Sequence, residues 1–351
     1  MRLSALCTGF VLVATLAEAH PTITLFDVPD ASQRPGRGTA PSGLNNLGDV
    51  AGYYITAKRH IGFIRSADGS YTTFRIGHRA NTFVFGINDA GQTTGLYTPD
   101  ADGIPHGFVR EADGTVHGFD PPGAGGIFGT EPLLINNRGT SAGFYGTADG
   151  VAHGFLRFAS GIVKTFDAPG AGTGSNTGTF VSNLNARNEA VGYYLDDDFV
   201  SHAFLRKANG EVQTFDVAGT RGVSPQALTA KGAMTGYVQD ENEAWHGFLR
   251  STQGDVTEFD APNGGTLSGQ GTTGYTINMH GLIGGYTIDS GFAYHGFLRR
   301  PSGQIVPVDV EGAGAGGNQG TVVQVVNDAG EAMGFILDGR GVFHGFLRSR
   351  D

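Results

Sequence analysis

Short runs of apolar and polar residues, separated by glycine-containing turns, recur along almost the whole chain. A clear example is the stretch 153–167, His-Gly-Phe-Leu-Arg-Phe-Ala-Ser-Gly-Ile-Val-Lys-Thr-Phe-Asp. Two short runs with aromatic and branched residues around such a turn are typical of a β-hairpin. The pattern therefore predicts an all-β protein made of short antiparallel strands.

The opening of this stretch returns at a nearly fixed spacing. Copies of His-Gly-Phe-Leu-Arg, some altered, begin at Ile61, His106, His153, His202, His246, His295 and His344. The steps between them are 45, 47, 49, 44, 49 and 49 residues. A period of this size indicates a repeat architecture.

Three further signatures follow in constant order within each repeat. A Phe-Asp pair comes first, as at 166–167, then Ile/Leu-Asn-x-x-Gly, as at 135–139, then Gly with two aromatic or apolar residues, as at 192–194. Asn-x-x-Gly suits a type I turn, with Asn at its first position and Gly at its fourth. Four strands in about 47 residues, repeated seven times, predict a seven-bladed β-propeller of four-stranded antiparallel blades.

The link lengths predict the order of strands within a blade. The one long link runs from Phe-Asp to the strand before Asn, as at 169–179. If it joins the outer strand of one blade to the inner strand of the next, the Phe-Asp strand is outermost and the Asn-ending strand is innermost. The chain begins with an outer-type strand at 22–27, and its last repeat stops after a third strand at 344–348. The N-terminal strand is therefore predicted to complete the last blade and close the ring, which leaves no open sheet edge.

The first 19 residues have the features of a secretory signal. Arg2 precedes an apolar run at 3–16, and Ala17-Glu18-Ala19 has the small-x-small pattern of a cleavage site. The apolar run is too short to span a bilayer. We therefore expect an extracellular or periplasmic protein with one propeller domain over 20–351 and no membrane insertion after cleavage. Cleavage also removes Cys7, the only cysteine.

The charge narrows the range of partners. The formal net charge is −10, which makes nucleic acid and anionic membranes poor partners.

The 59 glycines suit many tight turns, and they lack the three-residue period that is typical of collagen. We expect a monomer.

The repeat signatures together resemble the HAF family of extracellular repeats, which is named for its His-(Ala/Gly)-Phe core. His202-Ala203-Phe204 is that core in this chain, and the resemblance covers roughly residues 22–348. The resemblance implies a secreted bacterial protein with a repetitive β fold, and it carries over no catalytic residues. The first repeat departs from the family pattern, since Ile61 stands where His is expected.

Positions where the repeats differ are candidate ligand contacts, because blade packing favours sameness and ligand binding does not. Eight or nine residues before the recurring Asn, at the predicted channel mouth, the repeats carry Arg37, Arg79, Asn176, Arg221, Gln270 and Gln319. Arginine suits planar recognition of carboxylate or sulfate. We therefore predict a polar, anion-tolerant ligand site at this mouth. The alternative is that these are ordinary exposed residues of variable loops.

Other candidates for chemistry are sparse. Glu131 is the only carboxylate on the predicted inner strands, where it could act as a general base if it faced the channel, or be a bystander if it lay in a loop. The acidic turns 100–103, 196–198 and 240–243 could hold calcium, but none has the full twelve-residue loop pattern, so solvated turns are the simpler interpretation. The recurring histidines are too far apart around a ring to share a zinc ion, and we expect each to hydrogen-bond within its own blade. The sequence predicts no cofactor.

Since no nucleophile, metal cluster or acid/base pair stands out, the sequence favours a secreted non-enzymatic binding or scaffold protein. Its ligand at the channel mouth would be a carbohydrate, a peptide or another cell-surface component. The alternative is a secreted hydrolase or lyase acting on an anionic polysaccharide at the same face, and a third hypothesis is adhesion through the whole ring. Glu131 gathered with a His or Tyr and the three arginines in one pocket would favour the enzyme.

Overall fold

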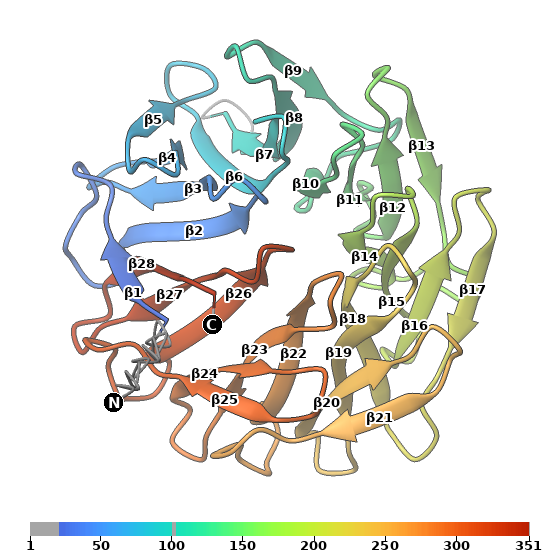
Figure 1. Ribbon diagram of the computed structural model, residues 1–351. Helices are drawn as coiled ribbons and strands as arrows, with labels where there is room; N and C mark the ends of the chain where they lie inside the picture. Colours follow the sequence, from blue (N-terminus) through green and yellow to red (C-terminus); the bar gives the residue numbers. More distant parts are fainter. Residues whose placement is uncertain (1–20, 100–102, 351) are drawn as a thin grey trace, which may run out of the picture.

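The computed structural model describes residues 21–99 and 103–350, which form 28 β-strands. The strands follow one another around a central axis, and the strand next to that axis in each repeat is the one that ends at the recurring Asn (Figure 1). The predicted signal at 1–19 lies outside the described residues. No helix in the described part of the chain is long and apolar enough to cross a membrane.

Antiparallel pairing joins consecutive strands into four-stranded groups. In group 1, β2 (Gly38–Leu44) pairs with β3 (Val50–Ile55), which pairs with β4 (His60–Arg65), which pairs with β5 (Tyr71–Phe74). Group 2 holds β6 (Asn81–Ile87), β7 (Thr93–Thr98), β8 (His106–Arg110) and β9 (Val116–Phe119); group 3 holds β10 (Thr130–Ile135), β11 (Ser141–Gly146), β12 (Ala152–Arg157) and β13 (Val163–Phe166). Group 4 holds β14 (Gly178–Leu184), β15 (Ala190–Leu195), β16 (Ser201–Arg206) and β17 (Val212–Phe215); group 5 holds β18 (Gly222–Leu228), β19 (Met234–Gln239), β20 (Trp245–Arg250) and β21 (Val256–Phe259); group 6 holds β22 (Gly271–Ile277), β23 (Ile283–Ile288), β24 (Tyr294–Arg299) and β25 (Ile305–Val308).

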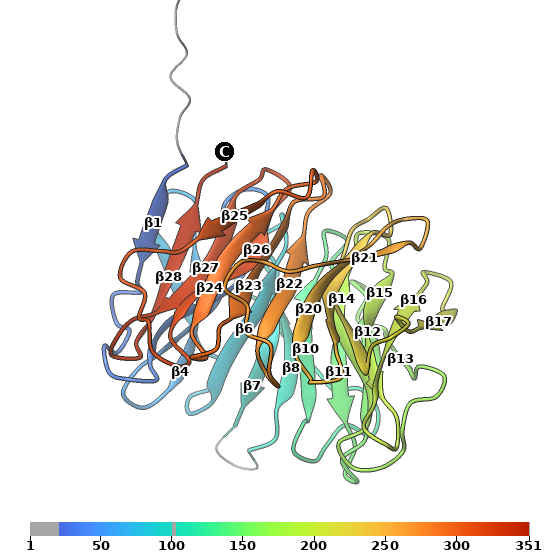
Figure 2. The same ribbon diagram turned by 90° about the horizontal axis from the view of Figure 1, so that it is seen from below.

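Group 7 is assembled from both ends of the described chain. β26 (Gly320–Val326), β27 (Ala332–Leu337) and β28 (Phe343–Arg348) are followed by β1 (Ile23–Phe26), which pairs antiparallel with β28. This is the pairing that the sequence predicts for the N-terminal strand, and Figure 2 shows β1 beside β28 at the edge of the molecule. Groups 7 and 1 also meet directly, since Gly38 of β2 forms a parallel bridge with Phe343 of β28.

The recurring Asn ties neighbouring groups together around the axis. The side-chain oxygen of Asn136 accepts the backbone N–H groups of Arg138 (3.0 Å) and Thr140 (3.1 Å), which closes the turn after the inner strand. Its amide donates to the carbonyl oxygen of Asn185 in the next group, at 2.9 Å. The same bond from Asn327 to the carbonyl of Asn45, at 3.0 Å, joins the last group to the first. These buried bonds give the motif a structural reason to recur.

The Arg and Phe of the repeat signatures also join groups. The Arg206 guanidinium lies over the ring of Phe166 from the preceding group, 5.0 Å from its centroid, and Arg65 lies over Phe26 of β1 at 5.2 Å. The Gly of His-Gly-Phe makes room for the same ring, because a Cβ at Gly154 would lie 2.7 Å from Phe166.

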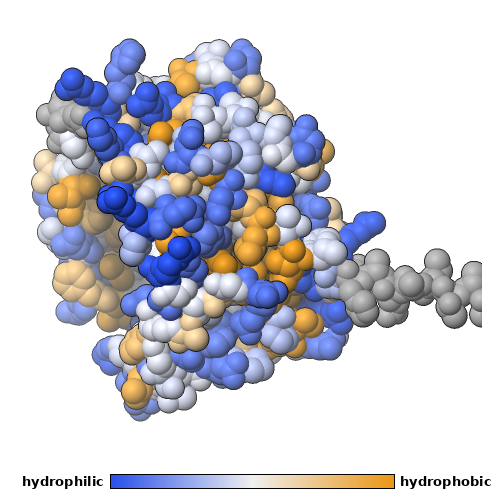
Figure 3. Space-filling model, turned by 90° about the vertical axis from the view of Figure 1, so that its left-hand side faces the viewer, coloured by the Kyte–Doolittle hydropathy of each residue, from blue (hydrophilic) through white to orange (hydrophobic). Residues whose placement is uncertain are grey.

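The surface of the molecule on the side of β1 and its neighbours has apolar patches among polar residues (Figure 3).

Candidate functional site

A cavity of about 560 Å³ lies on the axis between the inner strands. One layer of its wall comes from a single position of each inner strand, three residues before the recurring Asn or its replacement Thr229. The layer consists of Ser42, Phe85, Leu133, Ser182, Gln226, Tyr275 and Gln324. These side chains range from serine to glutamine, leucine, phenylalanine and tyrosine, whereas the positions that join the groups repeat. The sequence carried this signal, but the prediction looked for variation in the loops before the strands and so missed it.

A second cavity of about 340 Å³ adjoins the first between groups 6 and 7. It lies toward the N-terminal mouth, which is the end of the channel where the inner strands begin. We call it the tyrosine pocket, and its wall includes Tyr275, Tyr286, Tyr294, Asn318, Gln324, Phe335 and Phe343. The Tyr286 and Tyr294 rings meet edge to face with centroids 5.7 Å apart. Four of these residues line both cavities, so a ligand can reach from one into the other.

The polar groups of the tyrosine pocket are uncharged. Burial raises the pKa of Tyr286, and the neighbouring tyrosines Tyr275 and Tyr237 raise it further, so its hydroxyl stays protonated and can donate near neutral pH. The side-chain oxygen of Gln324 has no hydrogen-bond partner among the described residues. A buried amide oxygen of this kind is a ready acceptor for a ligand hydroxyl.

The six predicted ligand contacts all lie just before an inner strand, at the N-terminal mouth, but none is part of the wall of either cavity. Arg37 donates to the carbonyl oxygen of Thr56 at 3.3 Å, and Arg221 pairs with Glu243 at 3.3 Å. Arg79 and Asn176 are exposed. No hydrogen bond or ion pair between any two of the six occurs in the described structure.

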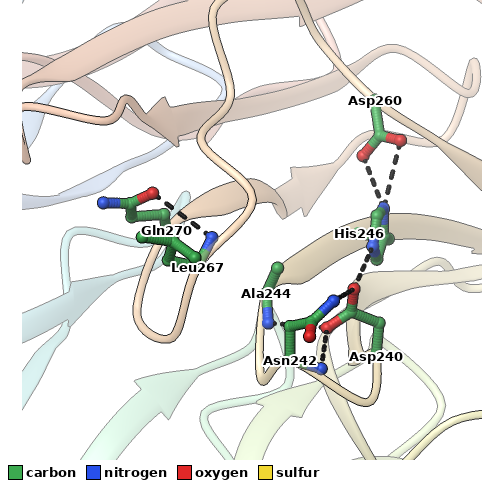
Figure 4. A network of polar contacts seen from close by, with 7 residues as sticks. All are labelled: Asp240, Asn242, Ala244, His246, Asp260, Leu267 and Gln270. Carbon is green, nitrogen blue, oxygen red and sulfur yellow. Dashed lines mark hydrogen bonds and ion pairs between the residues drawn. The ribbon is translucent and has the colours of Figure 1, made fainter.

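Gln270 and Gln319 serve the links that contain them. Gln270 is 2 % exposed, and its side-chain oxygen accepts the backbone N–H of Leu267 at 3.3 Å (Figure 4). Gln319 accepts the N–H of Gly316 at 3.1 Å and donates to the carbonyl of Gly339 at 3.4 Å. Both side chains therefore hold the glycine-rich links in shape.

The recurring histidines hydrogen-bond within their own groups, as predicted. His246 lies between Asp260, 2.9 Å from Nδ1, and Asp240, 3.7 Å from Nε2 (Figure 4). The equivalent contact in group 7 joins His344 to Asp27 at 2.8 Å, next to β1. The first repeat lacks both partners at once, since Ile61 and Arg75 replace His and Asp.

The acidic turns use their carboxylates internally. Asp196 accepts the backbone N–H groups of Asp198 and Val200, both at 2.9 Å, and Asp240 accepts those of Asn242 (2.8 Å) and Ala244 (2.9 Å). Over residues 21–99 and 103–350, no three His, Cys, Asp or Glu side chains gather as a metal site would require. Asp100 and Asp102 of the remaining turn lie outside these residues.

The His-Asp contacts predict a pH-dependent stability. Burial lowers the pKa of His202, but hydrogen bonds to Asp216 and Asp196 and the charges of these carboxylates outweigh burial, so the pKa is raised above 6.5. The contribution to stability is therefore full below pH 6.5 and is lost as the pH rises through the raised pKa. We expect His202→Gln to lower the thermal unfolding temperature more at pH 6 than at pH 8.5, whereas His78→Gln, at an exposed position, should have no such difference. An equal loss at both pH values would contradict this assignment.

Glu131 lies on β10 rather than in a loop, directly opposite Phe144 of β11. Burial raises its pKa to about 7, and no neighbouring positive charge contributes to the shift. The three arginines make their contacts elsewhere or are exposed. The described residues therefore do not form the constellation of Glu131 and arginines that would favour an enzyme.

No protein-family model matches the chain, and no curated protein matches it. Among solved structures, a streptogramin B lyase is similar with a TM-score of 0.59 and 13% identity, covering 93% of this chain and 97% of the lyase. A lectin from Burkholderia pseudomallei gives 0.53 and 11% over 88% and 94%. A puromycin hydrolase gives 0.53 and 15% over 87% of this chain and 50% of that one. Likeness at these identities concerns the fold and leaves the function open. The chain has a β-propeller fold.

Proposed function

We propose that the protein is a secreted, seven-bladed propeller that binds a carbohydrate at the N-terminal mouth of its channel and catalyses no reaction. The seven groups of four strands and the pairing of β1 with β28 support the blade count and the closed ring. The signal-like first 19 residues support secretion. The repeat signatures support membership of the HAF-type repeats.

The observation that carries the proposed ligand is the tyrosine pocket. A sugar ring has apolar C–H faces that pack against aromatic rings and hydroxyls that need paired donors and acceptors. Tyr286 and Phe335 supply ring surfaces, and the amides of Asn318 and Gln324 supply both donor and acceptor groups. Its volume of about 340 Å³ lies in the range of small-molecule sites.

The wall also selects a class of sugar. None of the described residues that form it is Asp, Glu, Lys or Arg. The predicted arginines lie outside the wall, so the pocket offers no partner for a carboxylate or sulfate. We therefore propose a neutral saccharide as the ligand, in place of the anionic one that the mouth arginines suggested.

An array of neutral and acidic oligosaccharides, followed by calorimetry, tests this function. Gln324→Leu keeps the volume of the side chain and removes its amide, so we expect about a tenfold loss of affinity for the sugar that binds. Gln213→Leu, on the exposed outer strand β17, is the matched control and should bind as the wild type does.

Three outcomes would count against this function. They are no saccharide bound, an acidic sugar preferred, or unchanged affinity in Gln324→Leu. Breakdown of the bound sugar, abolished by Glu131→Gln, would establish the hydrolase or lyase alternative instead.

A further inference from the structure

Glu131 occupies a position where the fold does not require a charge. The equivalent residues of the other inner strands are Ala40, Phe83, Phe180, Ser224, Thr273 and Val322. Each is apolar or carries a small hydroxyl group. A carboxylate at this place therefore calls for an explanation other than packing.

A row of three aromatic rings begins beside this carboxylate, near the N-terminal mouth. Glu131 and Phe144 are directly opposite in the β10–β11 pair, so their side chains project from the same face of the sheet. The Phe144 ring meets Phe180 at 5.1 Å, and Phe180 stacks on Tyr193 at 5.1 Å. Burial raises the pKa of Tyr193 to about 12, with the charges of Tyr237 and Glu131 adding to the shift, so the carboxylate lies near this phenol.

No group among the described residues compensates the charge of Glu131. In the described structure the Glu131 side chain has no hydrogen bond and no ion pair, although the residue is only partly exposed. An ionised carboxylate in such surroundings is costly unless a cation accompanies it. Since the residue keeps some exposed surface, a ligand can reach it.

We propose that Glu131 and the rings of Phe144, Phe180 and Tyr193 bind a trimethylammonium group. Ring faces attract cations, and aromatic cages are a common way to bind quaternary ammonium groups. A guanidinium group would need acceptors for its five N–H groups, which phenylalanine rings do not offer, whereas a trimethylammonium group needs none. This site is shared by groups 3 and 4, whereas the tyrosine pocket lies between groups 6 and 7, so the two proposals stand separately.

Choline and its neutral isostere 3,3-dimethyl-1-butanol are the probes. Calorimetry with the whole protein at pH 8 should give binding of choline that is at least tenfold tighter than binding of the isostere. Glu131→Gln should weaken choline binding at least tenfold, whereas Glu258→Gln, an exposed glutamate on β21, should leave it unchanged. Wild-type affinity should rise between pH 6 and pH 8 as the carboxylate ionises.

A second measurement protects the test against variants that fold poorly. Carbon-13 resonances of the wild-type glutamate carboxyls should show that choline lowers the pKa of Glu131, because the bound cation favours the charged form. Equal binding of choline and the isostere, retained choline binding in Glu131→Gln, or no choline binding at millimolar concentrations would each overturn the proposal. Sugar binding is scored independently through Gln324→Leu, so failure of one site does not imply failure of the other.

Discussion

A chain that begins at Val28, and therefore lacks β1, should lose its stable monomeric fold. Its removal uncovers the backbone edge of β28 that pairs with β1, and an open strand edge promotes association with other chains. It also takes Phe26 out of a core that includes Leu44, Phe63 and Met333. Replacing one buried phenylalanine by alanine costs about 3–5 kcal/mol, and here a whole strand is lost. Size-exclusion chromatography with light scattering and circular dichroism would detect the aggregates or unfolded chain.

A milder change separates strand docking from general damage. Phe26→Ala in the full chain should lower the free energy of unfolding by about 3 kcal/mol and speed amide hydrogen exchange in β28 first. Leu25→Ser, at a neighbouring position that is 46% exposed, is the control and should change little. A synthetic peptide of residues 21–30 should restore the monomer when added to the truncated chain. A truncated chain that stays monomeric with unchanged thermal stability would show that β1 is dispensable.

Replacing Glu131 by glutamine should stabilise the protein at pH 8 and leave its stability at pH 4 unchanged. The folded pKa is about 7, above the ordinary 4.5, so the folded state holds the proton more tightly and loses stability as the pH rises from 4.5 to 7. The full shift corresponds to about 3 kcal/mol, and partial exposure reduces this to roughly 2 kcal/mol. Glutamine has no charge to bury and so avoids this loss.

Urea unfolding at the two pH values measures this difference. Glu258→Gln should have no effect that depends on pH in this range, because its side chain is exposed. A Glu131→Gln variant that is equally stable to the wild type at pH 8, or less stable, would mean that the carboxylate is not desolvated. The measurement needs no ligand, so it checks the environment of Glu131 independently of choline.

The repeat frame could be predicted because the contacts between neighbouring groups use the same residue types in most repeats. Asn136 bonds to the next group's carbonyl, and Arg206 stacks on the previous group's Phe166, so both recur with the period of the fold. The long link after Phe-Asp then indicates which strand is outermost. A hydrogen bond of each recurring His within its own group could also be predicted, whereas its Asp partner was identified only in the structure.

The candidate site could be predicted only in part, because its residues obey no period. The tyrosine pocket combines Tyr275, Tyr286 and Tyr294 from three strands of group 6 with side chains of group 7. No regular spacing in the sequence predicts that these side chains lie together. Gln270 and Gln319 lie at the predicted mouth, but their side-chain oxygens accept backbone N–H groups of the glycine-rich links that contain them. The N–H groups of glycine-rich links need acceptors, and these amides are the nearest ones. Glu131 stood out only as a lone charge, since two of the aromatic residues near it, Phe180 and Tyr193, come from the next group.

Residues 22 and 349 lie side by side, with the backbone N–H of Ser349 donating to the carbonyl oxygen of Thr22 at 2.9 Å. This contact continues the pairing of β28 with β1 inside group 7. The Asn327 amide bonds to group 1 as Asn136 bonds to its next group, so group 7 has the contacts of a group made from consecutive strands. A circularly permuted gene, with residues 22 and 349 joined by a short linker and new termini placed in any long link, would encode the same set of hydrogen bonds. We therefore expect that the termini can be moved to a long link of another group, so that a permuted protein displays a fused partner beside that group.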